Sequence, residues 1–191
     1  AAMSWFAGFL AELKRLMPKV IYEIEVDLNM RQHLELGKID LAITAVPVDS
    51  AHLVSASLGS VKLLWVMSPG IVKSKQLSSA KSLLEKYPVW TLSKPALVHG
   101  ISKETLHRFG VRERNLDTCD HVLFLIEMAV SGGGIALLPE CLIHSHLAAG
   151  SLVSASAELR AEKLEFVIAR NKDQDEPLVC RIMDLVHKAS K

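Results

Sequence analysis

Several groups of residues in this 191-residue sequence have types and spacings that could support chemistry. The stretch SGGGIALLPE (131–140) contains three consecutive glycines, and glycine-rich turns cradle phosphates in some folds. Ser131 could be a nucleophile if it stood on a turn from a strand into a helix. Cys141, His144 and His146 are of the types that bind zinc. Paired carboxylates could exchange protons with a substrate, and the candidates are Glu23 with Glu25 and Glu162 with Glu165.

The elements around the glycines argue against phosphate binding. A helical pattern over residues 121–130 precedes them and the short apolar run IALLP follows them. The glycines Gly132–Gly134 therefore lie at a helix C-terminus, whose partial negative charge repels phosphate. Glycine suits that place because it accepts the positive φ of a helix cap. Ser131 leaves a helix rather than a strand, so the nucleophile hypothesis lacks its context.

The other groups do not converge either. In a helix over residues 139–146, His144 and His146 would point about 200° apart, so three zinc ligands would not meet. The first pair of carboxylates falls on the exposed face of an expected strand, and the second pair brackets the start of another. We therefore predict no enzyme activity, no metal site and no cofactor.

Composition limits the possible partners. Half of the residues are hydrophobic and the net charge is +1, so a core can form but no basic stripe for nucleic acid stands out. Lys14 with Arg15 and Arg112 with Arg114 are interpreted as ordinary solvated charges. No apolar run approaches the roughly 18 residues that span a membrane, and no basic leader precedes the apolar start. We expect a cytoplasmic protein without membrane contact, whose three cysteines are ordinary thiols.

Helical and strand patterns alternate along the chain. Helical spacing is expected at 6–17, 30–36 (ending at Gly37), 77–86, 103–109, 121–130, 139–146 and 178–188. Strands are expected at 20–26, 39–46, 61–67, 89–92, 135–139 and 164–169. This alternation predicts an α/β fold with largely parallel sheets. Ser68-Pro69-Gly70 and the polar segment 170–177 interrupt it, and we interpret both as crossings between two lobes.

Polar residues follow some of these strands. His99, Thr118, Asp120 and His121 lie where strand-like segments give way to helices, which is where open α/β sheets bind ligands. Helix capping is an equally good interpretation of Thr118 and Asp120.

Five stretches, taken in order and at their spacing, resemble one family. They are FLAELKRLMPKVIYEIEV, LELGKIDLAIT, LLWVMSPG, LIEMAVSGGGIALLPE and LEFVIARN. Together they resemble the effector-binding (regulatory) domain of LysR-type transcriptional regulators over essentially the whole chain. The resemblance implies a two-lobed fold of the periplasmic-binding-protein type 2, each lobe a mixed, mainly parallel sheet flanked by helices. Residues 1–69 would begin the first lobe, 70–169 would form the second, and 170–191 would return to the first.

The resemblance also implies a small-molecule effector in a cleft between the lobes. Carried over by position, the cleft residues are Phe6, Asn29, Thr44, Ala45, Val98, His99, Gly100, Thr118, Asp120 and His121, with Ala1 and Ala2 beside them. These positions offer hydrogen-bonding groups but no lysine or arginine. We therefore expect a small polar metabolite, neutral or singly anionic, met by helix N-terminal amides.

The same resemblance implies an oligomeric state and a mode of DNA binding. Regulatory domains of this family pair side by side, so we expect a homodimer or homotetramer in which helix 6–17 meets helix 121–130 of another copy. DNA would be bound only by an N-terminal winged helix-turn-helix, which we do not find in this sequence; most of the family's first strand is missing as well. A stand-alone solute-binding protein of the same fold remains the alternative, and an upstream helix-turn-helix or signal peptide would separate the two.

The charge balance predicts that this chain alone binds duplex DNA no better than a neutral control protein. Tight DNA binding requires clustered Lys and Arg to neutralise phosphates, and its affinity then falls steeply with salt. Fluorescence anisotropy with a labelled promoter fragment at two salt concentrations tests this expectation. Submicromolar binding that weakens with added salt would contradict it.

Overall fold

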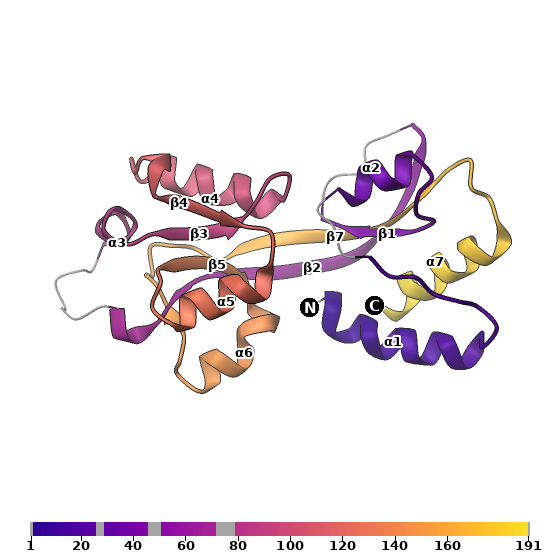
Figure 1. The fold of residues 1–191 in the computed structure, drawn as a ribbon, viewed down its shortest axis with the longest axis horizontal. Helices are drawn as coiled ribbons and strands as arrows, with labels where there is room; N and C mark the ends of the chain where they lie inside the picture. Colours follow the sequence, from indigo (N-terminus) through magenta and orange to yellow (C-terminus); the bar gives the residue numbers. More distant parts are fainter. Residues whose placement is uncertain (1, 26–28, 46–50, 72–78, 191) are drawn as a thin grey trace. The chain divides into compact units, whose positions relative to one another are not determined.

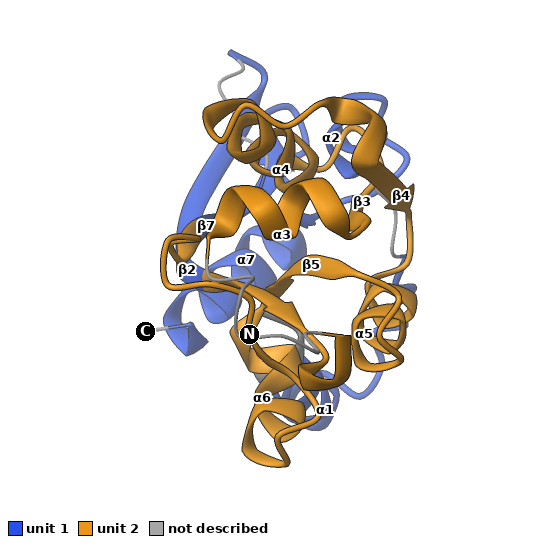
Figure 2. Cartoon of the chain, turned by 90° about the vertical axis from the view of Figure 1, so that its left-hand side faces the viewer, with its two compact units in different colours: residues 1–61, 164–191 blue, residues 62–163 orange. Residues whose placement is uncertain are grey.

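The chain divides into two compact units (Figure 2). The structure, a computed structural model, describes residues 2–25, 29–45, 51–71 and 79–190, except the side chains of residues 2–5. Unit 1 comprises Ala1–Val61 and Leu164–Lys191, and unit 2 comprises Lys62–Lys163. The divisions fall within strands β2 (Leu53–Met67) and β7 (Glu162–Asn171). We expected the crossings a few residues later, in the polar turns; a long strand can instead serve both units, because each unit packs on a different part of it.

Unit 1 is built around β1 and β7 (Figure 1). Strand β1 (Ala42–Thr44) pairs antiparallel with β7. Successive residues of β7 face opposite sides: Ile168 packs in a cluster with helices α1 and α7, and Ala169 packs in a cluster with α2. The helices among the described residues of unit 1 are α1 (Ala2–Leu16), α2 (Met30–Glu35) and α7 (Pro177–Ala189).

The expected strand at 20–26 is not a strand over its described residues, 20–25. Its alternation is that of a strand, yet Ile21 and Ile24 are 91% and 58% exposed. A strand satisfies its backbone groups through a neighbouring strand. Among the described pairings, none involves this segment, so its pattern alone does not hold it in a sheet.

Unit 2 is a mixed sheet between two layers of helices. Strand β3 (Val89–Leu92) pairs parallel with β4 (Leu116–Cys119) and β5 (Ile135–Pro139). The end of β2 pairs antiparallel with β5 and with the short β6 (Val153–Ser154). The helices are α3 (Ala80–Lys86), α4 (Leu97–Arg108), α5 (Val122–Val130) and α6 (Glu140–Ala148), with single turns η1 (Pro69–Ile71) and η2 (Glu113–Asn115).

The two faces of the unit 2 sheet have different cores. On one face Val66 and Leu138 pack against α5 and α6 in an apolar cluster with Leu125 and Ile143. On the other face Ser102 of α4 donates a hydrogen bond to Thr91 of β3 at 3.0 Å, and both side chains are fully buried. Figure 1 shows α4 on one side of these strands and α5 and α6 on the other.

The α/β class and the mixed sheet are confirmed, with corrections in detail. Parallel pairing is less common than expected, because among the described ladders only β3–β4 and β3–β5 are parallel. The sequence patterns missed β4, β6 and the first half of β2, and placed the start of α4 at Lys103 instead of Leu97. The first turn of α4 contains Gly100, a poor helix former, but buried Val98 and Ser102 hold it against the sheet.

The glycines after α5 serve the chain reversal, as the sequence indicated. Gly133 N–H bonds back to the Met128 carbonyl at 2.8 Å, which closes the end of the helix. Gly132 and Gly134 have φ values of 81° and 149°, which side chains rarely adopt. A Cβ at Gly134 would lie 2.3 Å from the Pro88 carbonyl oxygen. That oxygen accepts a hydrogen bond from Ile135 N–H, so it cannot move away without disturbing the start of the sheet pairing.

We predict that Gly134→Ala lowers the free energy of unfolding by about 2 kcal/mol or more, from backbone strain and overpacking. Gly100→Ala is the matched control: a Cβ there meets nothing within 4 Å. Inside α4 this control should raise stability by roughly 0.5–1 kcal/mol. Urea unfolding of both variants measures the difference, and equal stability of the two would contradict the prediction.

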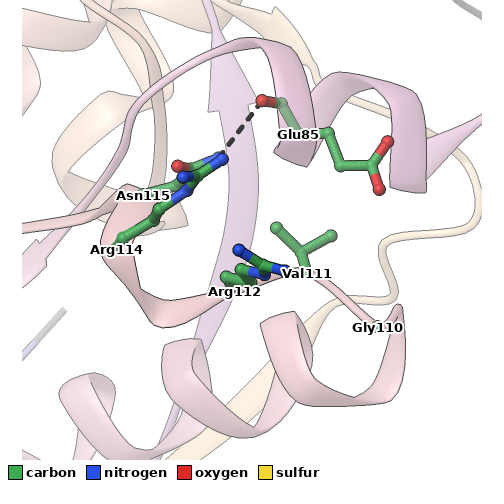
Figure 3. A pocket seen from close by; sticks show the side chains of 6 residues that line it. All are labelled: Glu85, Gly110, Val111, Arg112, Arg114 and Asn115. Atoms are coloured by element: carbon green, nitrogen blue, oxygen red, sulfur yellow. Dashed lines mark hydrogen bonds between the residues drawn. The ribbon is translucent and has the colours of Figure 1, made fainter.

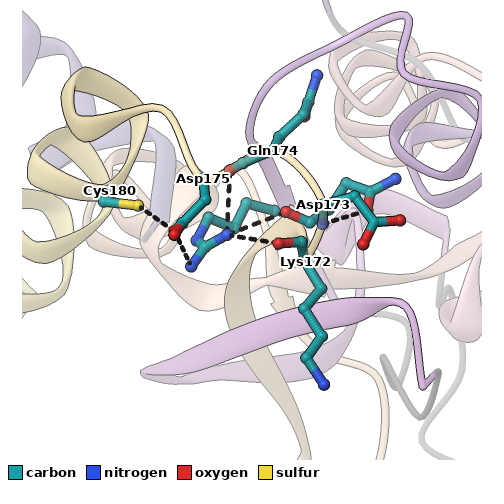
Figure 4. Close-up of polar contacts among 7 residues, drawn as sticks. Lys172, Asp173, Gln174, Asp175 and Cys180 are labelled. Carbon is teal, nitrogen blue, oxygen red and sulfur yellow. Dashed lines mark hydrogen bonds and ion pairs between the residues drawn. The ribbon is translucent and has the colours of Figure 1, made fainter.

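One arginine organises the turn between β7 and α7 in unit 1 (Figure 4). Arg170 Nη1 donates to the carbonyls of Asn171, Lys172 and Gln174 at 3.0–3.4 Å, and Nη2 lies 3.4 Å from Asp175 Oδ1. The Arg170 side chain is 14% exposed, whereas that of Asp175 is 82% exposed. The carbonyl contacts therefore contribute more than the ion pair, which solvent screens.

We predict that Arg170→Met lowers the free energy of unfolding by about 2 kcal/mol, because several carbonyls lose a charged donor. Asp175→Asn should change it by less than about 0.5 kcal/mol. Thermal and urea unfolding of the two variants measure whether the carbonyl contacts or the ion pair contribute more to stability. A larger loss in the Asp175 variant would show that the ion pair dominates.

Candidate functional site

Parallel strands β3 and β4 end side by side, and a helix begins just beyond each. Leu92 and Cys119 are register partners at these ends, and Ser93 N–H donates to the Cys119 carbonyl at 3.0 Å. Residues 93–96 lead into α4, and residues 120–121 lead into α5. The N-termini of both helices thus begin at the carboxyl edge of the same strand pair. Such an edge presents unpaired amides and a partial positive charge to a ligand.

The first turn of α4 contains three of the residues expected at the site. Val98 is 6% exposed and belongs to the core, and Gly100 is exposed but has no side chain to offer. His99 is half-buried, and its Nδ1 is a buried atom without a hydrogen-bond partner in the described part of the chain. Of these three residues, His99 is therefore the one whose side chain can form a hydrogen bond with a ligand.

The end of β4 and the start of α5 contain the other three. Thr118, Asp120 and His121 are all exposed. The N-cap residue of α5 is His121, whose side chain makes no capping hydrogen bond. No capping bond by Thr118 or Asp120 is found within the described residues either, so the capping interpretation gains no support.

Three residues at this edge were not anticipated. Ser93 and Lys94 lie in the connection to α4, and Lys94 is an exposed cation at an edge expected to have none. Cys119 ends β4, and its Sγ accepts a hydrogen bond from His121 N–H at 3.4 Å. The strand pattern of 89–92 ends at Leu92, so Ser93 and Lys94 could have been predicted to follow a strand end. Cys119 could not, because the sequence of β4 has no strand pattern.

The remaining expected residues belong to unit 1. Phe6 of α1 packs against the α7 cluster and stacks on Phe9 with ring centroids 6.3 Å apart. Asn29 is the exposed N-cap residue of α2. Thr44 ends β1, and Ala45 follows it; both are half-buried. Ala1 and the side chain of Ala2 lie outside the described residues.

The suspected zinc trio does not assemble. Cys141 and His144 are exposed on α6, while His146 Nδ1 lies 3.1 Å from Ser151 Oγ. Across the described ranges, no three His, Cys, Asp or Glu side chains come together as a metal site would require. The helices in those ranges are also all too short or too polar to cross a membrane.

Comparisons with known proteins give the chain its family. All residues, 1–191, match the LysR substrate binding domain. The HTH-type transcriptional regulator TrpI of Pseudomonas aeruginosa is 27% identical over 158 residues, which are 78% of this chain and 51% of that protein. This chain therefore spans about half the length of that curated relative.

Solved structures share the fold. The regulatory domain of MetR, a LysR family regulator from N. meningitidis, superposes with a TM-score of 0.75 at 16% identity, covering 99% of this chain and 90% of that one. Full-length LysG from Corynebacterium glutamicum with bound effector Arg gives a TM-score of 0.74 at 17% identity, covering 98% and 64%. With the match over its whole length, the chain belongs to the LysR substrate-binding domain family.

Proposed function

We propose that this chain is the part of a LysR-type transcriptional regulator that senses a small polar metabolite. The observation that carries the proposal is the carboxyl edge of β3 and β4, where α4 and α5 both begin. Exposed Thr118 and His121 lie at that edge together with the unpartnered Nδ1 of His99. The edge combines amide donors with side chains that can both donate and accept, which suits a polar ligand.

The charges at this edge suggest the class of ligand. Helix N-terminal amides and exposed Lys94 favour an anionic group, whereas exposed Asp120 disfavours additional negative charge. A neutral or singly anionic metabolite fits this balance better than a polyanion. The family resemblance also assigns Phe6, Asn29, Thr44 and Ala45 of unit 1, and Val98 and Gly100 of unit 2, to effector binding.

The family match and the relatives named above favour a regulatory domain over a stand-alone solute-binding protein. DNA binding would belong to an N-terminal domain of the whole regulator, which would act in the cytoplasm where the DNA is.

A melting-temperature screen of metabolites tests the sensing function. A ligand that binds only the folded chain raises stability by about 2.7 kcal/mol at a hundredfold excess over Kd. We expect at least one stabilising metabolite. His121→Ala and Thr118→Val should each weaken its binding about tenfold by removing one hydrogen bond.

The matched control is His144→Ala, which removes an exposed histidine of α6 that is not among the residues assigned to the site. It should leave the ligand-induced shift unchanged. The three unliganded variants should melt within a few degrees of the unaltered chain, because each side chain is exposed. A stabiliser whose shift survives both site substitutions would place the ligand elsewhere.

We further propose that two copies associate through α1 and α5. Leu123 and Phe124 of α5 are 58% and 48% exposed, and Leu16 of α1 is 62% exposed. Exposed apolar side chains on two helices suit a symmetric pairing in which α1 of one copy meets α5 of the other. Stable dimers bury roughly 800 Å² on each partner, which two helix faces can supply.

Sedimentation equilibrium at micromolar concentration should show a dimer, and Leu123→Glu should shift it towards monomer by placing a charge in the interface. Leu36→Glu is the control, because Leu36 is a similarly exposed leucine, at 61%, on neither helix. A monomeric unaltered chain, or equal effects of the two substitutions, would count against this interface.

A further inference from the structure

A polar hollow lies in unit 2, at the amino ends of β3 and β4 and so at the opposite end of these strands from the proposed effector edge. It has a volume of about 230 Å³ and adjoins another of about 190 Å³, with which it shares Glu85, Arg114 and Asn115. Drug-sized ligands occupy roughly 300–1,000 Å³, so each hollow suits a smaller molecule. Figure 3 shows the first hollow, bordered by Glu85, Arg112 and Arg114.

The backbone around the hollow is held in place. Asn115 Nδ2 donates to the carbonyls of Leu84 and Glu85, both at 3.2 Å, which ties η2 to the end of α3. Val111 N–H bonds to the Leu106 carbonyl at 2.9 Å, and Val111 is 7% exposed. Gly110 makes the turn out of α4 with a φ of 68°. The charged side chains therefore project from a fixed frame.

The two arginines on the hollow have no partner among the described residues. The guanidinium groups of Arg112 and Arg114 form no hydrogen bond or ion pair with any residue the structure describes. By contrast, Arg31 pairs with Glu35 at 3.0 Å. Two guanidinium groups on one small hollow provide planar donor forks, the geometry that binds a carboxylate most strongly.

The same hollow also attracts a cation. Glu85 lies on its wall, and its only described ion pair, with Lys81, is long at 3.9 Å and joins side chains that are more than half exposed. Such a pair is weak, so the carboxylate remains available to a ligand. Helix α3 ends at Lys86 and α4 ends at Arg108, beside the hollow, and helix C-termini favour positive charge.

We propose that this hollow is a second binding site, for a small zwitterion of the amino-acid type. Arg112 and Arg114 bind the carboxylate, and Glu85 binds the ammonium group. The adjoining hollow, lined by Lys86, Tyr87, Pro88 and Asp117, receives the ligand's side chain. Because recognition is assigned to the backbone groups of the amino acid, the simplest chiral member of the class suffices as a probe.

The experiment is an NMR titration of the ¹⁵N-labelled chain with L-alanine, propionate and ethylamine. The last two are alanine without its ammonium and without its carboxylate. Alanine should produce saturable shifts at the amides of Gly110, Val111, Arg112 and Asn115. Propionate and ethylamine should bind about tenfold more weakly or worse, because each loses one charge-assisted contact.

Substitutions assign the two ends of the ligand. Arg112→Gln with Arg114→Gln should weaken alanine and propionate alike, by about tenfold or more. Glu85→Gln should weaken alanine but leave propionate equal or tighter, because it removes only the partner of the ammonium group. Arg160→Gln, at an exposed arginine of unit 2 outside the hollow, should change nothing. The ¹H–¹⁵N spectrum of each free variant shows that it is folded.

Several results would overturn the proposal. They are the absence of saturable shifts at residues 110–115 with alanine, propionate binding as tightly as alanine, and tighter alanine binding in the Glu85 variant. Shifts confined to Thr118 and His121 would also overturn it and would instead support the effector edge. The two proposals can thus fail independently.

Discussion

The parallel pairing of β3 with β4 gives unit 2 two chemically different ends. Each strand runs into a helix, so α4 and α5 both start at the carboxyl edge and direct their free amides there. At the amino edge the direction is reversed, because α3 and α4 finish there and leave carbonyls that attract cations. A single choice of strand direction therefore places helix amide donors at one edge of the sheet and helix carbonyl acceptors at the other.

Elements with strong local signals could be predicted from the sequence. The pattern VWTL gave β3 with its observed bounds, and Gly37 marked the end of α2 through its positive φ. Elements that depend on distant partners could not. Strand β4 reads LDTC, with exposed Asp117 and Thr118, and it is ordered by β3 rather than by an apolar pattern. The segment 20–25 is the opposite case: its sequence has a clear strand pattern, but it pairs with no strand in the described part of the chain.

The candidate sites divide in the same way. Thr118, Asp120 and His121 could be placed just before a helix, because the apolar pattern of α5 marks where that helix starts. The amino-edge hollow could not, because Arg112 and Arg114 look like solvated charges until the fold brings Glu85 and Asn115 beside them. The Asn115 bonds to Leu84 and Glu85 connect segments that no local periodicity relates.

The order of the two units along the chain has a consequence for synthesis on the ribosome. Unit 2 is one uninterrupted stretch, whereas unit 1 is assembled from both ends of the chain. The core of unit 1 needs Ile168 of β7 and Met183 and Val186 of α7, which emerge after unit 2 is complete. Domains generally fold as units during synthesis. The apolar face of α1 therefore stays exposed in the nascent chain until α7 has been synthesised. We expect chaperones that bind exposed apolar segments to bind α1 during this interval.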